Sequence, residues 1–389
     1  MTVAGPGLDS SGTRGAAVVA LDAPGRHRGE WKALAKRALE PNIFYDPDFA
    51  LPAAAALAPG KALRGVCVHT DEADRPARLC GLFPFTLSRR WGIPITAGVA
   101  FIHPYAMSSA PLVGAGKQTQ AVSAFLDWLE RGGDAPAAWL FRFLPQDGAL
   151  KEAFDAALAE SGMRCRTFAR YERAVLDGSR IDRGDFVATM SPKRRREYRR
   201  LRRKLDGCGV VTVTRASAAE DVPVAMREYL ALEAAGWKGR CGTAAGLTRA
   251  TCEMFEAIAG GLGESGQIRV DALRLDGAPA AMAVSCGVGN SWWLWKISYD
   301  EAFAAFSPGV LAVLEVSERA IADGERYDSC ALPGIPMIER LWRERRPYAD
   351  MLIVPDRLGA LGDVVIQLES LRRQAEMAAK AARQRFRKG

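Results

Sequence analysis

The segment from Ser291 to Leu311 constrains the fold more than any other part of the chain. Its first nine residues are rich in Trp, Ile and Tyr, which predicts a strand over 291–299. The Ser-Pro-Gly run at 307–309 then places a capping hydroxyl and a proline at the start of an apolar helix pattern. Free amides and the positive end of the helix dipole would face the strand's carboxyl end and could hold an anion such as a pyrophosphate. A buried strand packed on an ordinary capped helix is the plainer interpretation.

Sequence patterns around this segment predict a mixed α/β fold. Asp276-Gly277 lies between two apolar runs and is a strong hairpin signal. The strand after the helix should pair parallel to the Trp-rich strand, because a helical crossover links them. The predicted elements are helices at 191–205, 222–232, 247–260 and 308–322, and strands at 210–214, 267–275, 279–286, 291–299, 326–331 and 348–354, the last of which is expected to close this unit.

The first part of the chain predicts another α/β unit. Residues 92–116 carry many Gly and Pro without a clear period and are expected to form a long loop. The other predicted elements are strands at 16–21, 62–69, 78–87, 139–143 and 164–176, and helices at 31–39, 118–130 and 150–160, with an Ala-rich helix reaching Leu57.

Chain length favours two domains and a tail. A chain of 389 residues exceeds what one hydrophobic core usually supports. The segment 177–184 is the expected boundary. The predicted organisation is a flexible N-terminus at 1–14, a first domain at 15–180, a second domain at 181–356 and a basic helical tail at 357–389.

The net charge of +8 is concentrated in two places, 181–210 and 357–389. Two positive helices on a nearly neutral body indicate an anionic partner, such as a phosphate-bearing substrate, a nucleic acid or an acidic membrane surface. No apolar run is long enough to span a bilayer, and the N-terminus lacks a signal-peptide core. We therefore expect a cytoplasmic protein without a transmembrane segment, with peripheral attachment to the inner membrane as an alternative.

Cysteine and histidine patterns do not predict a metal site. The eight cysteines have no CxxC pair, which is typical of reduced thiols. The three histidines all lie in the first third of the chain. A Cys/His metal cluster would therefore have too few candidates.

The order of elements in the second part resembles the GNAT acyltransferase superfamily. The resemblance rests on the basic opening at 191–205, the Gly-Trp-Lys-Gly-Arg loop at 236–240, the strand end at 295–300, the run at 307–309 and Tyr327-Asp328. More narrowly, the chain resembles bacterial cellulose-biosynthesis-type acetyltransferases, which are related to the Fem-type aminoacyltransferases. The latter carry two GNAT-like domains in tandem, so the resemblance implies two such domains here, followed by the basic helix.

This resemblance implies a donor site for acetyl-CoA or another acyl-CoA. In GNAT enzymes pantetheine lies between two strands that separate, and amides after the first of them hold the pyrophosphate. The residues that match this site here are Trp295, Ile297, Tyr299, Ser307, Gly309, Val310 and Leu311. The usual glycine-rich loop is replaced by a segment with a single glycine.

Acyl transfer needs a group that removes a proton and a group that stabilises an oxyanion. Asp300 or Glu301 could act as the base, and Lys296 could stabilise the developing charge or contact a phosphate. The alternative is a solvated turn in which Lys296 pairs with one of the two carboxylates.

Several basic and aromatic residues are candidates for substrate binding. Trp237, Lys238 and Arg240 combine an aromatic plane with two cations in one loop, which suits a sugar nucleotide or lipid-linked sugar phosphate. Arg195 and Arg199 could bind a diphosphate, RNA or a cyclic dinucleotide, although a solvated helix face gives the same pattern. Asp328 could face the cleft or cap the next helix.

Three functions are compatible with these features. The leading hypothesis is an N- or O-acyltransferase, such as an acetyltransferase, acting on a sugar precursor or lipid-linked intermediate in surface or exopolysaccharide biosynthesis. The second is a Fem-type enzyme that uses aminoacyl-tRNA. The third is a non-catalytic GNAT-like module that binds a signalling nucleotide such as cyclic di-GMP, or a partner in the polysaccharide-synthesis machinery.

Overall fold

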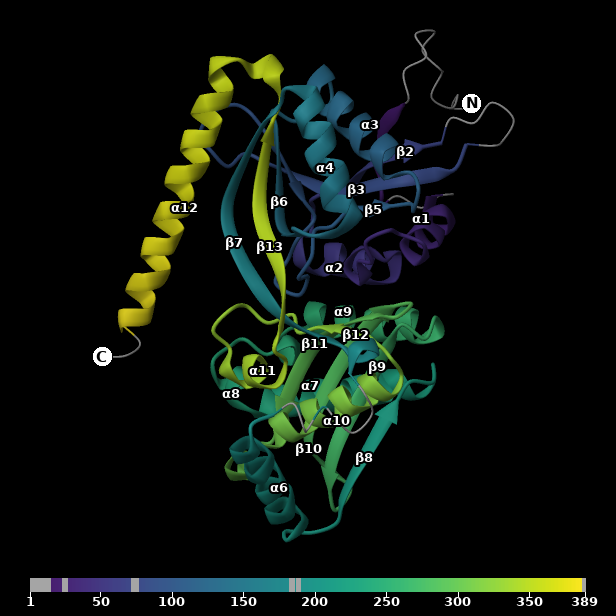
Figure 1. Ribbon diagram of the computed structural model, residues 1–389, viewed down its shortest axis with the longest axis vertical. Helices are drawn as coiled ribbons and strands as arrows, with labels where there is room; N and C mark the ends of the chain where they lie inside the picture. Colours follow the sequence, from purple (N-terminus) through teal and green to yellow (C-terminus); the bar gives the residue numbers. More distant parts are fainter. Residues whose placement is uncertain (1–14, 23–26, 71–76, 182–185, 187–189, 387–389) are drawn as a thin grey trace. The chain divides into compact units, whose positions relative to one another are not determined.

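The computed structural model describes residues 15–22, 27–70, 77–181, 186 and 190–386. The predicted flexible stretch at 1–14 and part of the predicted boundary at 177–184 lie outside these residues. Two compact units are present. The first contains 1–45, 61–171 and 347–389, and the second contains 46–60 and 172–346. Both combine helices with strands (Figure 1), which confirms the predicted mixed α/β class.

Strands of the first unit form a mixed layer covered by helices. Their order is β1 (Ala16–Ala20), β2 (Arg64–His69), β3 (Leu79–Ser88), β4 (Ala97–Ala100), β6 (Ala138–Pro145), β13 (Glu344–Val354) and β7 (Arg164–Asp177), with β5 (Leu112–Val113) beside β3. The last few residues of β7 and the first of β13 belong to the second unit. The helices are α1 (His27–Lys36), α3 (Gln118–Arg131), α4 (Gly148–Ser161) and α12 (Ala360–Phe386).

Two sequence predictions are wrong in this unit. The expected loop at 92–116 contains the short strands β4 and β5, because buried apolar residues there pair with β3 despite the surrounding glycines and prolines. The strand expected to close the second unit is β13, and from Tyr348 to Ile353 it pairs antiparallel with β6 of the first unit. Its apolar pattern is compatible with either sheet.

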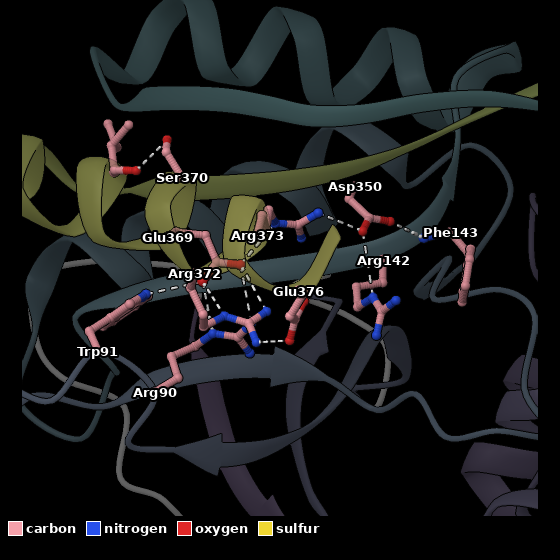
Figure 2. Close-up of polar contacts among 11 residues, drawn as sticks. Arg90, Trp91, Arg142, Phe143, Asp350, Glu369, Ser370, Arg372, Arg373 and Glu376 are labelled. Carbon is pink, nitrogen blue, oxygen red and sulfur yellow. Dashed lines mark hydrogen bonds and ion pairs between the residues drawn. The ribbon is translucent and has the colours of Figure 1, made fainter. Parts of the chain in front are cut away.

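The C-terminal helix α12 packs on the first unit. Val365 of α12 is fully buried in a cluster that includes Trp91, Leu140 and Leu352. Beside this cluster, Figure 2 shows Glu369 of α12 accepting hydrogen bonds from Trp91 and from three arginines, Arg90, Arg372 and Arg373. The helix is therefore anchored by both apolar and charged contacts.

The second unit contains the predicted strand, helix and hairpin order. Its strands follow one another as β7, β12 (Arg326–Asp328), β11 (Ser291–Tyr299), β10 (Ala278–Val288), β9 (Ile268–Leu275) and β8 (Val211–Ala216). Asp276 and Gly277 have φ angles of 49° and 85°, which fits the predicted tight hairpin turn. The helices are α2 (Pro47–Leu57), α6 (Pro192–Asp206), α7 (Asp221–Ala235), α8 (Trp237–Arg240), α9 (Arg249–Glu264), α10 (Pro308–Ala322) and α11 (Pro336–Leu341).

Helices cover both faces of this sheet (Figure 1). Val313 and Val316 of α10 pack in one cluster with Leu294 of β11. On the opposite face, the ring of Trp295 stacks on Phe255 of α9 with centroids 4.6 Å apart. Successive side chains of β11 thus pack against helices on opposite faces of the sheet. Among the described residues, no helix combines the length and the apolar character that a membrane crossing requires.

Candidate active site

β11 and β12 run side by side for only three residues. Ser291, Trp292 and Trp293 pair in parallel with Arg326, Tyr327 and Asp328, after which β12 ends while β11 continues to Tyr299. The sequence prediction of a parallel pair is confirmed.

A β-bulge explains why β11 leaves its neighbour. On the β10 side, Val284 pairs with Lys296 and Ser285 pairs with Leu294, so Trp295 is the extra residue of a bulge. A bulge bends its strand and increases the local twist. The bend falls just beyond the last residue that pairs with β12.

A cavity of about 320 Å³ occupies the space at this open edge. Its lining includes β11 from Leu294 to Tyr299, the segment 329–331 after β12, and Gly309 at the start of α10. A Cβ atom added to Gly309 would lie 3.4 Å from the Tyr299 ring. A larger side chain at this position would therefore project into the cavity.

Three charged side chains line the inner part of this cavity: Glu233, Lys238 and Lys296. The Glu233 side chain is fully buried at the end of α7. Lys238 Nζ donates to Glu233 Oε1 at 2.7 Å and to the Ile297 carbonyl at 2.9 Å. Lys296 Nζ lies 3.8 Å from the same Glu233 oxygen. One carboxylate thus faces two ammonium groups.

Further hydrogen bonds hold the Glu233 carboxylate in place. The Tyr229 hydroxyl donates to Oε1 at 2.9 Å, and the Ala245 amide donates to Oε2 at 2.8 Å. Burial would raise the pKa of Glu233, but the charges of Lys296 and Lys238 and these hydrogen bonds lower it overall. Glu233 is therefore ionised at neutral pH.

For Lys296, the effect of burial on the pKa is larger than the effect of the neighbouring charges. Burial lowers the pKa of Lys296 to about 8, because the charged form loses solvation, and the attraction of Glu233 only partly offsets this effect. The ammonium nitrogen also lies 5.7 Å from the centre of the Phe255 ring. An amine with this pKa is neutral in roughly one molecule in ten at pH 7, and in a larger fraction as the pH rises.

The predicted donor-site residues divide into two groups. Trp295, Ile297, Tyr299 and Gly309 all line the cavity. Val310 and Leu311 donate their amides to the Ser307 carbonyl at 3.0 and 3.3 Å, so these two amides are already used within the structure. Ser307 adopts a left-handed conformation with φ of 50° and makes no side-chain cap.

The predicted catalytic carboxylates lie beside the cavity lining. Asp300 accepts a hydrogen bond from the Ala302 amide at 2.9 Å and caps the short helix at Glu301–Phe306. Glu301 accepts from Arg240 at 2.5 Å. These contacts are those expected if Asp300 and Glu301 belong to a turn, which was the alternative to a catalytic role. Lys296 pairs with Glu233.

The predicted substrate-binding residues are spread over four places. Arg240 is exposed and pairs with Glu301. Trp237 and Lys238 line the cavity, and Trp237 is 47% exposed. Arg195 and Arg199 border a separate groove of about 650 Å³ between α6 and α10. Asp328 is buried and lies 3.4 Å from the fully buried Arg173.

Glu233 is the site residue that sequence reasoning missed. A glutamate near the end of an amphipathic helix is usually solvent-exposed, and nothing in the pattern marks this one as buried. Its spacing to Tyr229 and to Lys238 was the available signal. Across the described residues, no group of three or more His, Cys, Asp and Glu side chains is placed to hold a metal ion.

Comparison with known proteins defines the class of this unit. Residues 192–332 match the model of the acetyltransferase (GNAT) domain. This match covers α6 to β12 and most of the cavity lining, and it identifies residues 192–332 as a GNAT acetyltransferase domain, which supports an acyltransferase enzyme. The expectation of an enzyme is thereby confirmed.

Solved structures share the overall fold. FemX is similar over 87% of this chain and 98% of its own, with 11% identity and a TM-score of 0.57. A conserved protein of unknown function from Bacteroides thetaiotaomicron VPI-5482 is similar over 84% and 96%, with 12% identity and a TM-score of 0.53. The likeness to FemX confirms a Fem-type fold. A comparison with curated protein sequences finds no match.

Proposed function

We propose that the chain transfers an acyl group from acetyl-CoA or another acyl-CoA to an amine or hydroxyl of a sugar. The main support for this proposal is the cavity at the open edge of β11, whose lining includes Gly309 at the start of α10. A pantetheine arm is narrow and extended, and its amides can bond to an exposed strand edge in the manner of an added strand. The thioester would then lie near Lys296.

Gly309 supports the position of the donor's pyrophosphate. Its missing side chain leaves room beside the helix start, and the dipole of α10 favours a negative group there. The helix has 15 residues, long enough for an appreciable dipole. Of the four predicted phosphate-binding residues, Gly309 is the one that lines the cavity.

Trp237 supports a sugar as the acceptor. Its half-exposed ring lines the cavity and offers a flat apolar surface to a sugar ring. The proposed acceptor is a precursor or lipid-linked intermediate of surface polysaccharide synthesis. This choice follows from the resemblance to cellulose-biosynthesis-type acetyltransferases, as do the proposed contacts with the synthesis machinery. A cytoplasmic location, with peripheral attachment to the inner membrane as an alternative, is proposed from the sequence.

Transfer from aminoacyl-tRNA is the second candidate function. The basic helix α6 and the groove beside Arg195 and Arg199 favour it, because guanidinium groups bind phosphates. The fold likeness to FemX is compatible with this donor. A non-catalytic module that binds cyclic di-GMP would use the same arginines.

Calorimetry distinguishes these functions. Acetyl-CoA, bulk tRNA and cyclic di-GMP are titrated in turn into the full chain, each at low and high salt. We expect saturable heat with acetyl-CoA. Heat with tRNA alone, with an affinity that falls steeply as salt rises, would favour the second candidate. Heat with cyclic di-GMP alone would favour the binding module.

A further inference from the structure

We infer that Lys296 accepts the proton of the attacking amine or hydroxyl, and that Glu233 and Lys238 position it for this task. This inference rests on the acyltransferase function proposed above. It assigns the base to β11 in place of Asp300 or Glu301, which were the sequence-based candidates. Acyl transfer forms a bond from the acceptor nitrogen or oxygen to the carbonyl carbon and breaks the carbon–sulfur bond. The acceptor's proton passes to Lys296 Nζ, and the CoA thiolate leaves.

Geometry separates the roles of the two lysines. Lys238 Nζ contacts both Glu233 and the Ile297 carbonyl within 3 Å, so its protons are held by two acceptors. Lys296 Nζ lies 3.8 Å from Glu233, beyond hydrogen-bond distance. Lys238 is therefore the direct ion-pair partner of the carboxylate. The charges of Glu233 and Lys238 act on Lys296 at a longer distance.

Glu233 itself is a poor proton acceptor. Its oxygens already accept from Tyr229, Lys238 and the Ala245 amide, and hydrogen bonds to the ionised form make a carboxylate a weaker base. Glu233 thus acts as a positioning residue.

The surroundings of Lys296 contain few groups that could replace it. Titratable side chains along or behind the cavity lining are Tyr229 and Glu233 on α7, Lys238 on α8, Tyr299 on β11 and Cys330 after β12. α9 contributes the apolar ring of Phe255. Burial raises the pKa of the Cys330 thiol well above its ordinary value, and it is not a base near neutral pH. The lowered pKa of Lys296 brings its change of charge toward the range where a base is most effective.

Two substitutions should move the protonation of Lys296 in opposite directions. Lys238→Met removes a repelling positive charge, so the pKa of Lys296 should rise. Glu233→Gln removes an attracting negative charge, so the pKa of Lys296 should fall. A purely structural role for the pair would not produce opposed shifts. Lys204→Met, at an exposed position on α6, is the matched control and should leave Lys296 unchanged.

Competitive labelling measures these values directly. The full chain and each variant are labelled with trace acetic anhydride from pH 6 to 11, and peptide mass spectrometry gives the titration of every lysine. We expect Lys296 to titrate near pH 8, with opposed shifts in the two variants. Titration of Lys296 in the ordinary range of a lysine, or shifts in one direction, would overturn the inference.

Turnover provides the second readout. CoA release from acetyl-CoA is measured with D-glucosamine as acceptor and water as background. Lys296→Arg keeps the positive charge but cannot lose its proton, so CoA release should fall by about 10²-fold or more while acetyl-CoA still binds. Release at the wild-type rate in this variant would overturn the inference. Absence of acetyl-CoA binding to the wild-type chain would instead refute the proposed function.

Discussion

The pairing of Arg173 with Asp328 shows how one residue's role depends on a partner far away in sequence. Asp328 follows a predicted strand, and its position there suggested a substrate contact. In the structure it faces the fully buried Arg173 guanidinium and also accepts from the Cys330 amide at 2.8 Å. No local pattern relates positions 173 and 328. The interpretation therefore needed the fold.

Asp328→Asn should lower stability. Removing one partner of a buried ion pair typically costs about 3–5 kcal/mol, because the remaining charge is less well compensated. Chemical denaturation of the variant and wild type measures this loss. Unchanged stability together with weaker substrate binding would support the original substrate-binding interpretation.

The stability of the first unit should decrease at low pH because of Glu369. Burial would raise the pKa of Glu369, but hydrogen bonds and charges from Arg372 and Arg90 lower it to about 2 (Figure 2). A carboxylate whose folded pKa is lowered stabilises the fold above its unfolded pKa, and this contribution is lost as the pH falls from about 4.5 toward 2. The contribution is on the order of 2–3 kcal/mol.

Unfolding measured between pH 2 and 6 checks this prediction. Glu369→Gln should be less stable than wild type at pH 6, and the difference should shrink toward pH 2. A constant difference across the range would show that the carboxylate's charge is not responsible.

At the scale of elements, the hairpins and the strand-to-helix junction were predictable, whereas the bulge was not. The Asp-Gly pair and alternating apolar residues predict β9, β10 and β11 to within three residues at every end. The extra residue at Trp295 has no sequence signature, because it follows from how β11 pairs with β10. The sequence therefore predicts the position of β11, but it does not predict the bulge at which β11 separates from β12.

Gly277→Ala should weaken the β9–β10 hairpin. Gly277 has a φ angle of 85°, where a side chain is strained, so the free energy of unfolding should fall by about 1 kcal/mol or more. Gly260→Ala on α9 is the control, because its added Cβ meets nothing within 4 Å and the helical position favours alanine. Equal effects of the two substitutions would contradict this explanation.

At the scale of the whole molecule, sequence order does not match the compact units. Residues 46–60 belong to the second unit, where α2 packs on α9, and 347–389 belong to the first. Local patterns predict helices and strands but cannot assign a segment to a distant core. The domain ranges drawn from the sequence remain a proposal for independently folding parts.

Deletion of α12 at 360–386 should destabilise the first unit. The deletion removes buried Val365 and Glu369 and uncovers Trp91, Leu352 and Val354. Exposure of these apolar groups should lower the melting temperature and increase binding of a hydrophobic dye. An unchanged melting temperature would show that the packing of α12 contributes little.

The central claim is that the cavity between β11 and the segment after β12 receives the donor's extended arm. Titration calorimetry of acetyl-CoA into Gly309→Leu, with Gly260→Leu as the matched helix-glycine control, tests it most directly. The account predicts that Gly309→Leu weakens binding at least tenfold, about 1.4 kcal/mol, while the control binds as wild type does. Equal affinity in all three proteins would contradict the account.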